Sequence, residues 1–303
     1  MSNNFPQTAD HLDLERWVDE AGDNPDQQAI RRVIRIIVNA VSCFDELRDL
    51  MTIKGGVLLA AAYKTGRHTR DVDFSTRVLA REIDIEETCQ RLDSALELSA
   101  AKLEETLACR VQSKKLKPPD EGATFPTLRI RVGYAERGSK AQSRLERGSS
   151  PHTVIVDLSF NEALTDPVTI RVNEDRRINA YSLVAQIAEK YRALIQQQAR
   201  YRSRVRRQDA YDIYCILNMG YLRKPEDRTA LLAAIRESCD SRNVEVDASS
   251  MMHDEIRRRA RQEFDQLQYE LDRDLPDFDE MFDRVSNFYA NLPWDEANHR
   301  ERG

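Results

Sequence analysis

The sequence has no long hydrophobic segment, and we expect no secretory signal. None of its apolar runs approaches the roughly 20 residues that a membrane-spanning helix requires. Residues 1–20 are polar and acidic, and they lack the basic start and apolar core of a secretory signal. We therefore expect a cytoplasmic protein that has no membrane partner.

Cysteine is scarce, and no two cysteines have the spacing of a zinc site. Five scattered cysteines in a chain of 303 residues instead predict reduced thiols, as in most cytosolic proteins. They are Cys43, Cys89, Cys109, Cys215 and Cys239.

An excess of basic residues is also absent. The chain has 46 Lys and Arg against 52 Asp and Glu, a formal net charge of −6. This balance does not exclude a nucleic-acid partner, because a local basic face can still bind phosphates. With 41% hydrophobic residues the chain can bury a core, and its length suits two domains or one domain with an extension.

Two kinds of pattern divide the chain. Up to about residue 178, segments with helical spacing mix with short alternating segments that are typical of strands, and beyond it nearly every segment is helical. We expect an α/β domain over 1–178, with a mixed sheet, flanking helices and an N-terminal helical extension, and a helical domain over 179–303. The expected helices cover 27–50, 57–63, 82–107, 182–200, 207–219, 226–238, 251–273 and 277–291; the expected strands cover 50–53, 71–75, 128–132 and 153–160; mobile loops are expected at 113–126 and 136–152.

Two aspartates in one predicted strand suggest a metal site. Asp71 and Asp73 are separated by one residue, so their side chains leave the strand on the same face. Asp157 lies in a later, otherwise apolar strand, where a lone carboxylate requires a cation or another partner. Carboxylates of this kind hold Mg²⁺ or Mn²⁺, and nucleotidyl transfer requires such a cation.

Gly55 and Gly56 stand at the start of an apolar predicted helix. Glycines at this position let the backbone approach a phosphate group, where the helix N-terminus offers N–H groups. Each feature alone is weak evidence, because a D-x-D pair is often a solvated strand edge and a Gly-Gly pair is often only a turn. Their combination in this order favours a nucleotidyltransferase.

These residues carry a resemblance to a known family. Lys54-Gly55-Gly56 before an apolar helix, followed by Arg67-x-Thr69-x-Asp71-Val72-Asp73-Phe74, resembles the AbiEii-type nucleotidyltransferases of the DNA polymerase β-like superfamily. The residue after the glycines is usually small in this family, and here it is Val57. The family's helical motifs are matched by Lys190-Tyr191-Arg192-Ala193-Leu194 and by Arg206-Arg207-Gln208-Asp209-Ala210-Tyr211-Asp212-Ile213.

The resemblance implies roles for these residues. It implies that Asp71 and Asp73 bind the metal, with Asp157 as the third acidic residue, and that Lys190 and Asp209 complete the catalytic set. The nucleotide would be bound by Lys54, Gly55, Gly56, Arg67, Thr69 and Lys190. The family consists of the toxin halves of type IV toxin–antitoxin and phage-abortive systems. It therefore implies a nucleoside triphosphate substrate, an RNA acceptor such as a tRNA 3′ end, and a cognate antitoxin.

The residues themselves leave the roles in the helical domain open. Lys190 shares a helix face with Leu183, Ile187 and Leu194, so it either reaches water along that face or extends toward the triphosphate. Asp209 is either an acidic residue favoured by the dipole at a helix N-terminus, or a base for the attacking hydroxyl, or a residue that orders Lys190. Asp212 has a functional role or simply pairs with an arginine.

An arginine-rich segment precedes the second helical motif. Arg200, Arg202 and Arg204 either form a solvated charged loop or bind the phosphates of an RNA acceptor. The favoured hypothesis places the nucleoside triphosphate between the two domains. Two alternatives remain: a non-catalytic nucleotide-sensing or protein-binding module of a defence complex, and the same chemistry on a small-molecule or protein acceptor.

Overall fold

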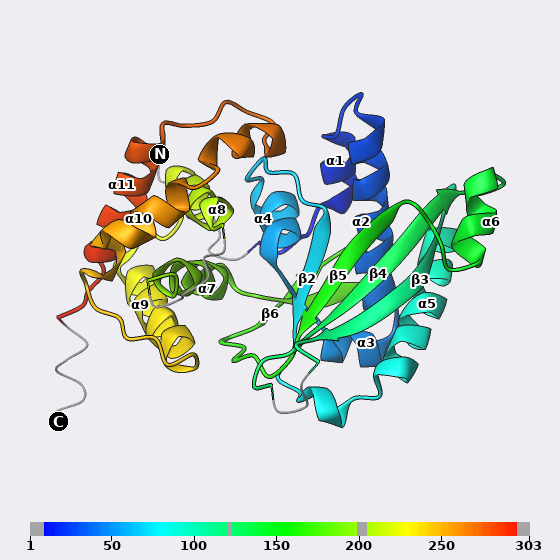
Figure 1. Cartoon of the computed structure of the whole chain (residues 1–303), viewed down its shortest axis with the longest axis horizontal. Coiled ribbons are helices and arrows are strands. Elements are labelled where there is room, and N and C mark those ends of the chain that lie inside the picture. The colour runs from blue at the N-terminus through cyan, green and yellow to red at the C-terminus, as the bar shows by residue number, and fades with distance from the viewer. Residues whose placement is uncertain (1–8, 120–122, 199–204, 296–303) are drawn as a thin grey trace. The chain divides into compact units, whose positions relative to one another are not determined.

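The computed structural model describes residues 9–119, 123–198 and 205–295. They form two compact units (Figure 1), which we call the sheet unit (residues 9–64 and 68–181) and the helical unit (residues 65–67 and from 182 onward). Within the described residues the chain passes between the units at 64–65, 67–68 and 181–182, whereas the sequence suggested one boundary, after residue 178.

The sheet unit is built on a seven-stranded mixed sheet with the order β3-β4-β5-β2-β1-β7-β6. The pairs β2–β5 and β1–β7 are parallel, and the other neighbours are antiparallel. The strands are β1 (Thr52–Lys54), β2 (Asp71–Ser75), β3 (Leu107–Lys117), β4 (Thr127–Glu136), β5 (Thr153–Ser159), β6 (Val168–Arg171) and β7 (Arg177–Ala180). The helices of this unit are α1 (Leu14–Asp19), α2 (Pro25–Cys43), α3 (Asp45–Leu50), α4 (Gly55–Tyr63), the 3₁₀ helix η1 (Ala80–Glu82), α5 (Ile85–Lys102) and α6 (Lys140–Glu146).

One face of the sheet is buried under helices. Val154, Val156 and Leu158 alternate along β5 and are fully buried, and α2 and α5 pack against each other and against this part of the sheet (Figure 1). Residues at the intervening positions are partly exposed, so the other face of β5 is polar. This alternation decides which face can carry chemistry. The face that Asp157 shares is called here the polar face.

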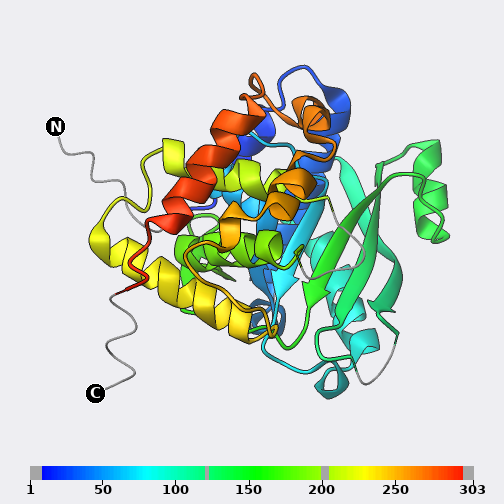
Figure 2. The ribbon, with the colours of Figure 1, turned by 60° about the vertical axis from the view of Figure 1, so that its left-hand side comes forward.

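The helical unit has its own core. Its helices are α7 (Leu183–Ile195), α8 (Arg207–Asn218), α9 (Pro225–Asp240), η2 (Ser250–Met252), α10 (Asp254–Arg261), η3 (Phe264–Glu270) and α11 (Phe278–Ala290). Helix α7 packs against α8 and α9, and α8 packs against α11 (Figure 2). The Tyr191 hydroxyl donates to the Val285 carbonyl at 3.0 Å, and the Tyr191 ring contacts Tyr289. The buried Tyr191 side chain thus combines apolar packing with a hydrogen bond at its hydroxyl.

Several predicted elements differ from the observed ones. The expected helix 27–50 is interrupted at Phe44, which is extended, and Asp45 and Glu46 begin a new helix where acidic residues are favourable. The expected loop 113–126 starts inside β3, and the loop 136–152 contains α6. The expected helix 251–273 is divided where Glu263 adopts a left-handed conformation. Strands β6 and β7 were not predicted.

Two further expectations concern sequence-wide features. All five cysteines lie within the described residues and are free thiols. Among the described helices, none combines the length and the apolar character that a membrane crossing requires.

Candidate active site

Strand β2 presents two carboxylates on the polar face. Val72 and Phe74 are fully buried, whereas Asp71 is exposed and Asp73 is partly exposed between them. The predicted alternation is thus the observed one, and both aspartates leave the strand on the side away from the core.

The sheet register places further charged residues beside Asp73. Asp73 lies opposite Lys54 on β1 and opposite Asp157 on the parallel strand β5, and Asp157 lies opposite Arg129 on β4. Directly opposed residues share a face, and neighbouring strands are about 4.8 Å apart. The four side chains therefore form a row across four strands.

Arg129 holds the Asp157 carboxylate with two hydrogen bonds. Its Nε and Nη2 atoms donate to Oδ1 and Oδ2 at 2.9 and 2.6 Å. The hydrogen bond to Asp157 is the largest influence on Arg129 and raises the pKa of its guanidinium, and the negative charges of Asp71 and Asp73 add to this effect. Arg129 was not among the predicted site residues. Its alternation with Ile130 in the predicted strand 128–132 already placed it on the polar face.

Gly55 lets the first turn of α4 lie against Asp73. Its φ is +75°, and a Cβ atom there would lie 2.2 Å from Asp73 Oδ2. Any larger residue would displace the carboxylate or the helix start. The residue before the helix, Lys54, provides no side-chain cap, and its ammonium lies 5.4 Å from the centre of the Tyr181 ring. The β1–α4 turn is thus shaped around the Asp73 carboxylate.

The segment before β2 orients Asp71. Thr69 is buried, and its hydroxyl donates to Asp71 Oδ1 at 2.9 Å. The neighbouring His68 Nδ1 lies 2.9 Å from Nη2 of buried Arg31 on α2. Thr69 was predicted to bind the nucleotide. In the structure its side chain contacts the carboxylate of Asp71.

The donor set fits a divalent cation chemically. Asp71 and Asp73 supply carboxylate oxygens, which Mg²⁺ and Mn²⁺ prefer, on one face of one strand. Asp157 lies beside Asp73, but its carboxylate is held by Arg129. Within the described residues, no group of three or more His, Cys, Asp or Glu side chains is close enough to hold a metal.

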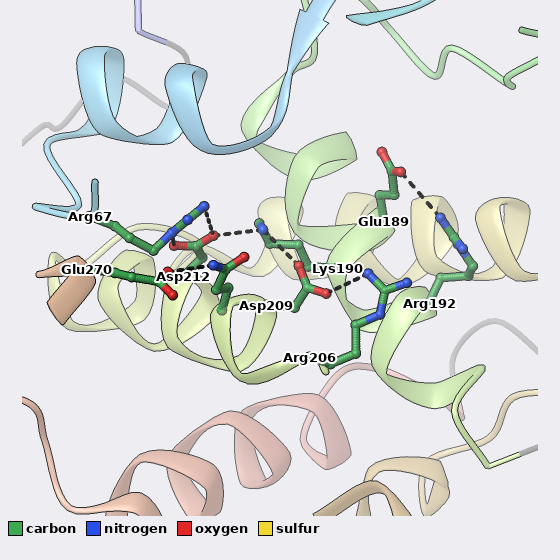
Figure 3. Close-up of polar contacts among 9 residues, drawn as sticks. Arg67, Glu189, Lys190, Arg192, Arg206, Asp209, Asp212 and Glu270 are labelled. Carbon is green, nitrogen blue, oxygen red and sulfur yellow. Dashed lines mark hydrogen bonds and ion pairs between the residues drawn. The ribbon is translucent and has the colours of Figure 1, made fainter. Parts of the chain in front are cut away.

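The helical unit contains a chain of alternating buried charges (Figure 3). Asp212 on α8 is fully buried between Arg67 and Lys190, and Asp209 lies between Lys190 and Arg206. The Lys190 ammonium is 3.0 Å from Asp209 Oδ1 and 2.8 Å from Asp212 Oδ2, and Arg67 Nε is 3.0 Å from Asp212 Oδ1. Each buried charge therefore has at least one opposite neighbour.

For Lys190 and Asp209, the effect of neighbouring opposite charges on the pKa exceeds the effect of burial. Burial alone would lower the pKa of Lys190, but Asp212 and Asp209 raise it above its ordinary value. Burial would raise the pKa of Asp209, but Lys190 and Arg206 hold it below its ordinary value. Lys190 and Asp209 are therefore charged at neutral pH.

The structure brings some predicted residues together and leaves others apart. Arg67, expected to bind the nucleotide, contacts Asp212 in the helical unit, and Lys190 faces two carboxylates of that unit. Contact of Lys190 with the triphosphate and catalysis by Asp209 stay predictions. The predicted acceptor-binding residues Arg200, Arg202 and Arg204 lie outside the described residues.

Comparison with known proteins points to one family. The family model described as "Nucleotidyl transferase AbiEii toxin, Type IV TA system" matches residues 38–284. A search of curated proteins found no match. A crystal structure from H. pylori, described as a nucleotidyltransferase, is similar at 13% sequence identity and a TM-score of 0.47, covering 92% of this chain and 99% of that chain. At this TM-score the likeness carries no functional argument.

Proposed function

The chain belongs to the AbiEii family of nucleotidyl transferase toxins of type IV toxin–antitoxin systems, and on this premise we propose that it transfers a nucleoside monophosphate from a nucleoside triphosphate to a hydroxyl group of RNA. It is a nucleotidyltransferase and a toxin by family. The metal, the RNA acceptor, which we take to be a tRNA 3′ end, and the residue roles are proposed here. We further propose that it acts in the cytoplasm, where its substrates and a cognate antitoxin would be present.

The proposal is carried by the placement of Asp71 and Asp73. Both aspartates lie on the polar face of β2, and the α4 start lies against Asp73 at Gly55. A triphosphate bound at that helix start would have its phosphates next to the two carboxylates, because N–H groups of a first helical turn attract anions. We propose that Gly55 and Gly56 bind the phosphates in this way.

Asp71 and Asp73 would hold Mg²⁺ or Mn²⁺, with Thr69 orienting Asp71 through its hydroxyl. When bound, the cation would neutralise phosphate charge and polarise the α-phosphoryl group. Asp157 would then complete this acidic centre and accept the proton of the acceptor hydroxyl.

The reaction balances with this set of groups. The acceptor oxygen forms a bond to the α-phosphorus, the bond between the α-phosphorus and the bridging oxygen of the β-phosphate breaks, and pyrophosphate leaves. The proton of the acceptor hydroxyl goes to the Asp157 carboxylate. Arg129 fixes the direction of this carboxylate through two hydrogen bonds.

The test compares the two strand aspartates with a distant one. Purified protein is incubated with Mg²⁺ or Mn²⁺, each α-labelled nucleoside triphosphate in turn, and total RNA. We expect label in RNA, and at least an approximately 10²-fold lower rate for Asp71→Asn and Asp73→Asn. Asp23→Asn, at an exposed position of the same unit, should retain the full rate.

The location of the label decides the acceptor. If both variants label RNA at the wild-type rate, the proposed roles of Asp71 and Asp73 are contradicted. Label that appears only in protein or in small molecules would reject RNA as the acceptor while leaving the transfer chemistry in place.

A further inference from the structure

The β3–β4 hairpin continues the polar face away from the proposed centre. Arg129 on β4 lies opposite both Asp157 on β5 and Lys115 on β3. On either side of this row, Arg131 lies opposite Ser113, and Thr127 lies opposite Lys117. Because directly opposed residues share a face, Arg131, Lys115 and Lys117 are on the same side of the sheet as Asp157.

These three cations are exposed and have no ion pair within the described residues. Arg131 has one side-chain hydrogen bond, from Nη2 to the Thr153 hydroxyl at 3.3 Å. Exposed ammonium and guanidinium groups lose little solvation when a surface phosphate approaches them. They therefore form a ready contact for a phosphodiester backbone.

Two other basic residues of the same strand differ in this respect. Lys114 lies opposite buried Ile130, on the helix-covered side, and forms an ion pair with Glu86 of α5. Arg110 lies opposite Gly133, on the side of Arg131, and forms an ion pair with Asp93 of α5 at 2.9 Å. Arg110 and Lys114 are thus neutralised by acids of α5, whereas Lys115 and Lys117 are exposed and have no ion pair within the described residues. This asymmetry indicates an external anion on the polar face.

We infer that Arg131, Lys115 and Lys117, which we call the hairpin strip, bind the phosphate backbone of an extended RNA acceptor whose terminal hydroxyl lies at Asp157. The inference rests on the proposed function. Lys115 is two strand spacings from Asp157, about 10 Å across the sheet. A ligand that reaches both must therefore span about 10 Å, which an RNA strand does along its phosphodiester backbone.

The test compares two double variants, one in the hairpin strip and one control that removes the same number of charges elsewhere. Lys115→Gln/Lys117→Gln removes two charges from the hairpin strip, and Lys102→Gln/Lys114→Gln removes two charges from α5 and from the side of β3 that faces it. Binding of a fluorescein-labelled single-stranded oligoribonucleotide is titrated at several salt concentrations. The strip variant should bind roughly tenfold or more weakly near 0.1 M salt, and its salt slope should fall by about one to two.

Steady-state kinetics separates this inference from the proposed function. The strip variant should show a higher KM for the RNA acceptor, with an unchanged KM for the nucleoside triphosphate and an unchanged kcat at saturating RNA. Oligonucleotide binding equal to that of the wild type, or weakened no more than in the matched pair, would overturn the inference even when transfer is active. Absence of transfer in the wild type would reject the proposed function, while the binding measurement would still decide the strip.

Discussion

At the scale of single residues, Gly55 allows a specific prediction because a second glycine serves as its control. Gly55 and Gly138 have φ values of +75° and +76°, but a Cβ atom at Gly138 would meet no atom within 4 Å. Alanine at either position should lower the free energy of unfolding by about 1–2 kcal/mol, because left-handed backbone disfavours a Cβ atom. Only Gly55→Ala also displaces the Asp73 carboxylate.

We therefore expect Gly55→Ala to reduce nucleotidyl transfer by about 10²-fold, the typical effect of misplacing a catalytic group by 1 Å. Gly138→Ala should retain activity. Chemical denaturation and the labelling assay measure the two effects separately. Equal activity of both variants would mean that the contact between Gly55 and Asp73 has no part in the reaction.

The sequence identified some of these residues and not their partners. Asp71 and Asp73 follow from a two-residue period within one strand, which is local information. The partnership of Arg129 with Asp157 depends on which strands are neighbours, and 28 residues separate the two in the chain. Arg67 and Asp212 are 145 residues apart. Local spacing carries no information about such pairs.

At the scale of elements, the ion pair between Arg67 and Asp212 joins the segment before β2 to α8. The same segment forms backbone contacts with residues 271–272, where the Asp272 N–H donates to the Gly66 carbonyl at 3.0 Å. Removing one partner of a buried ion pair typically costs about 3–5 kcal/mol. Because Lys190 still faces Asp212, Arg67→Met should lie near the lower end of this range.

Fluorescence of Trp294, a buried residue of the helical unit, measures this loss in a Trp17→Phe background, since the chain has two tryptophans. The double variant Arg67→Met/Asp212→Leu should be less destabilised than the sum of the single variants. Arg258→Met, which removes an exposed ion pair with Glu255, should leave stability nearly unchanged. An Arg67→Met variant as stable as Arg258→Met would show that the buried pair does not hold the segment.

The end of β3 was not predicted, because its charged residues interrupt the apolar alternation that is typical of strands. Residues 113–117 read as a polar loop because three of the five are lysines. They belong to β3, where Lys115 and Lys117 are exposed and Lys114 is neutralised by Glu86. A strand with one solvated face and a second face covered by charged groups lacks the apolar alternation on which prediction depends. Strand β5, which is apolar on its buried face, was predicted within one residue at its end.

At the scale of the whole molecule, the charge chain in the helical unit predicts a pH profile for stability. The depressed pKa of Asp209 means that its contribution is present above the ordinary value of 3.8 and is lost as pH falls through the lower folded-state pKa. The raised pKa of Lys190 means that its contribution is present below 10.5 and is lost as pH rises through the higher folded-state pKa. Between about pH 5 and pH 9 neither group titrates.

The stability difference between the wild type and Lys190→Met should therefore be greatest near neutral pH and should shrink at both extremes. Denaturant titrations monitored at Trp294 measure it, again in the Trp17→Phe background. The Trp294→Phe background, which leaves Trp17 in the sheet unit, reports whether the loss is confined to the helical unit. A difference that stays undiminished at both extremes of pH would contradict the assigned charges of Lys190 and Asp209.

The course of the chain through residues 65–67 has a consequence for biosynthesis. A nascent polypeptide that has been translated only to residue 181 already contains every strand of the sheet, yet it lacks Asp212, the counter-ion of Arg67. Since domains form in the order in which the ribosome releases them, the segment leading into Asp71 acquires its buried partner only after α8 has been made. The toxin thus forms the buried ion pair of residues 65–67 late in translation.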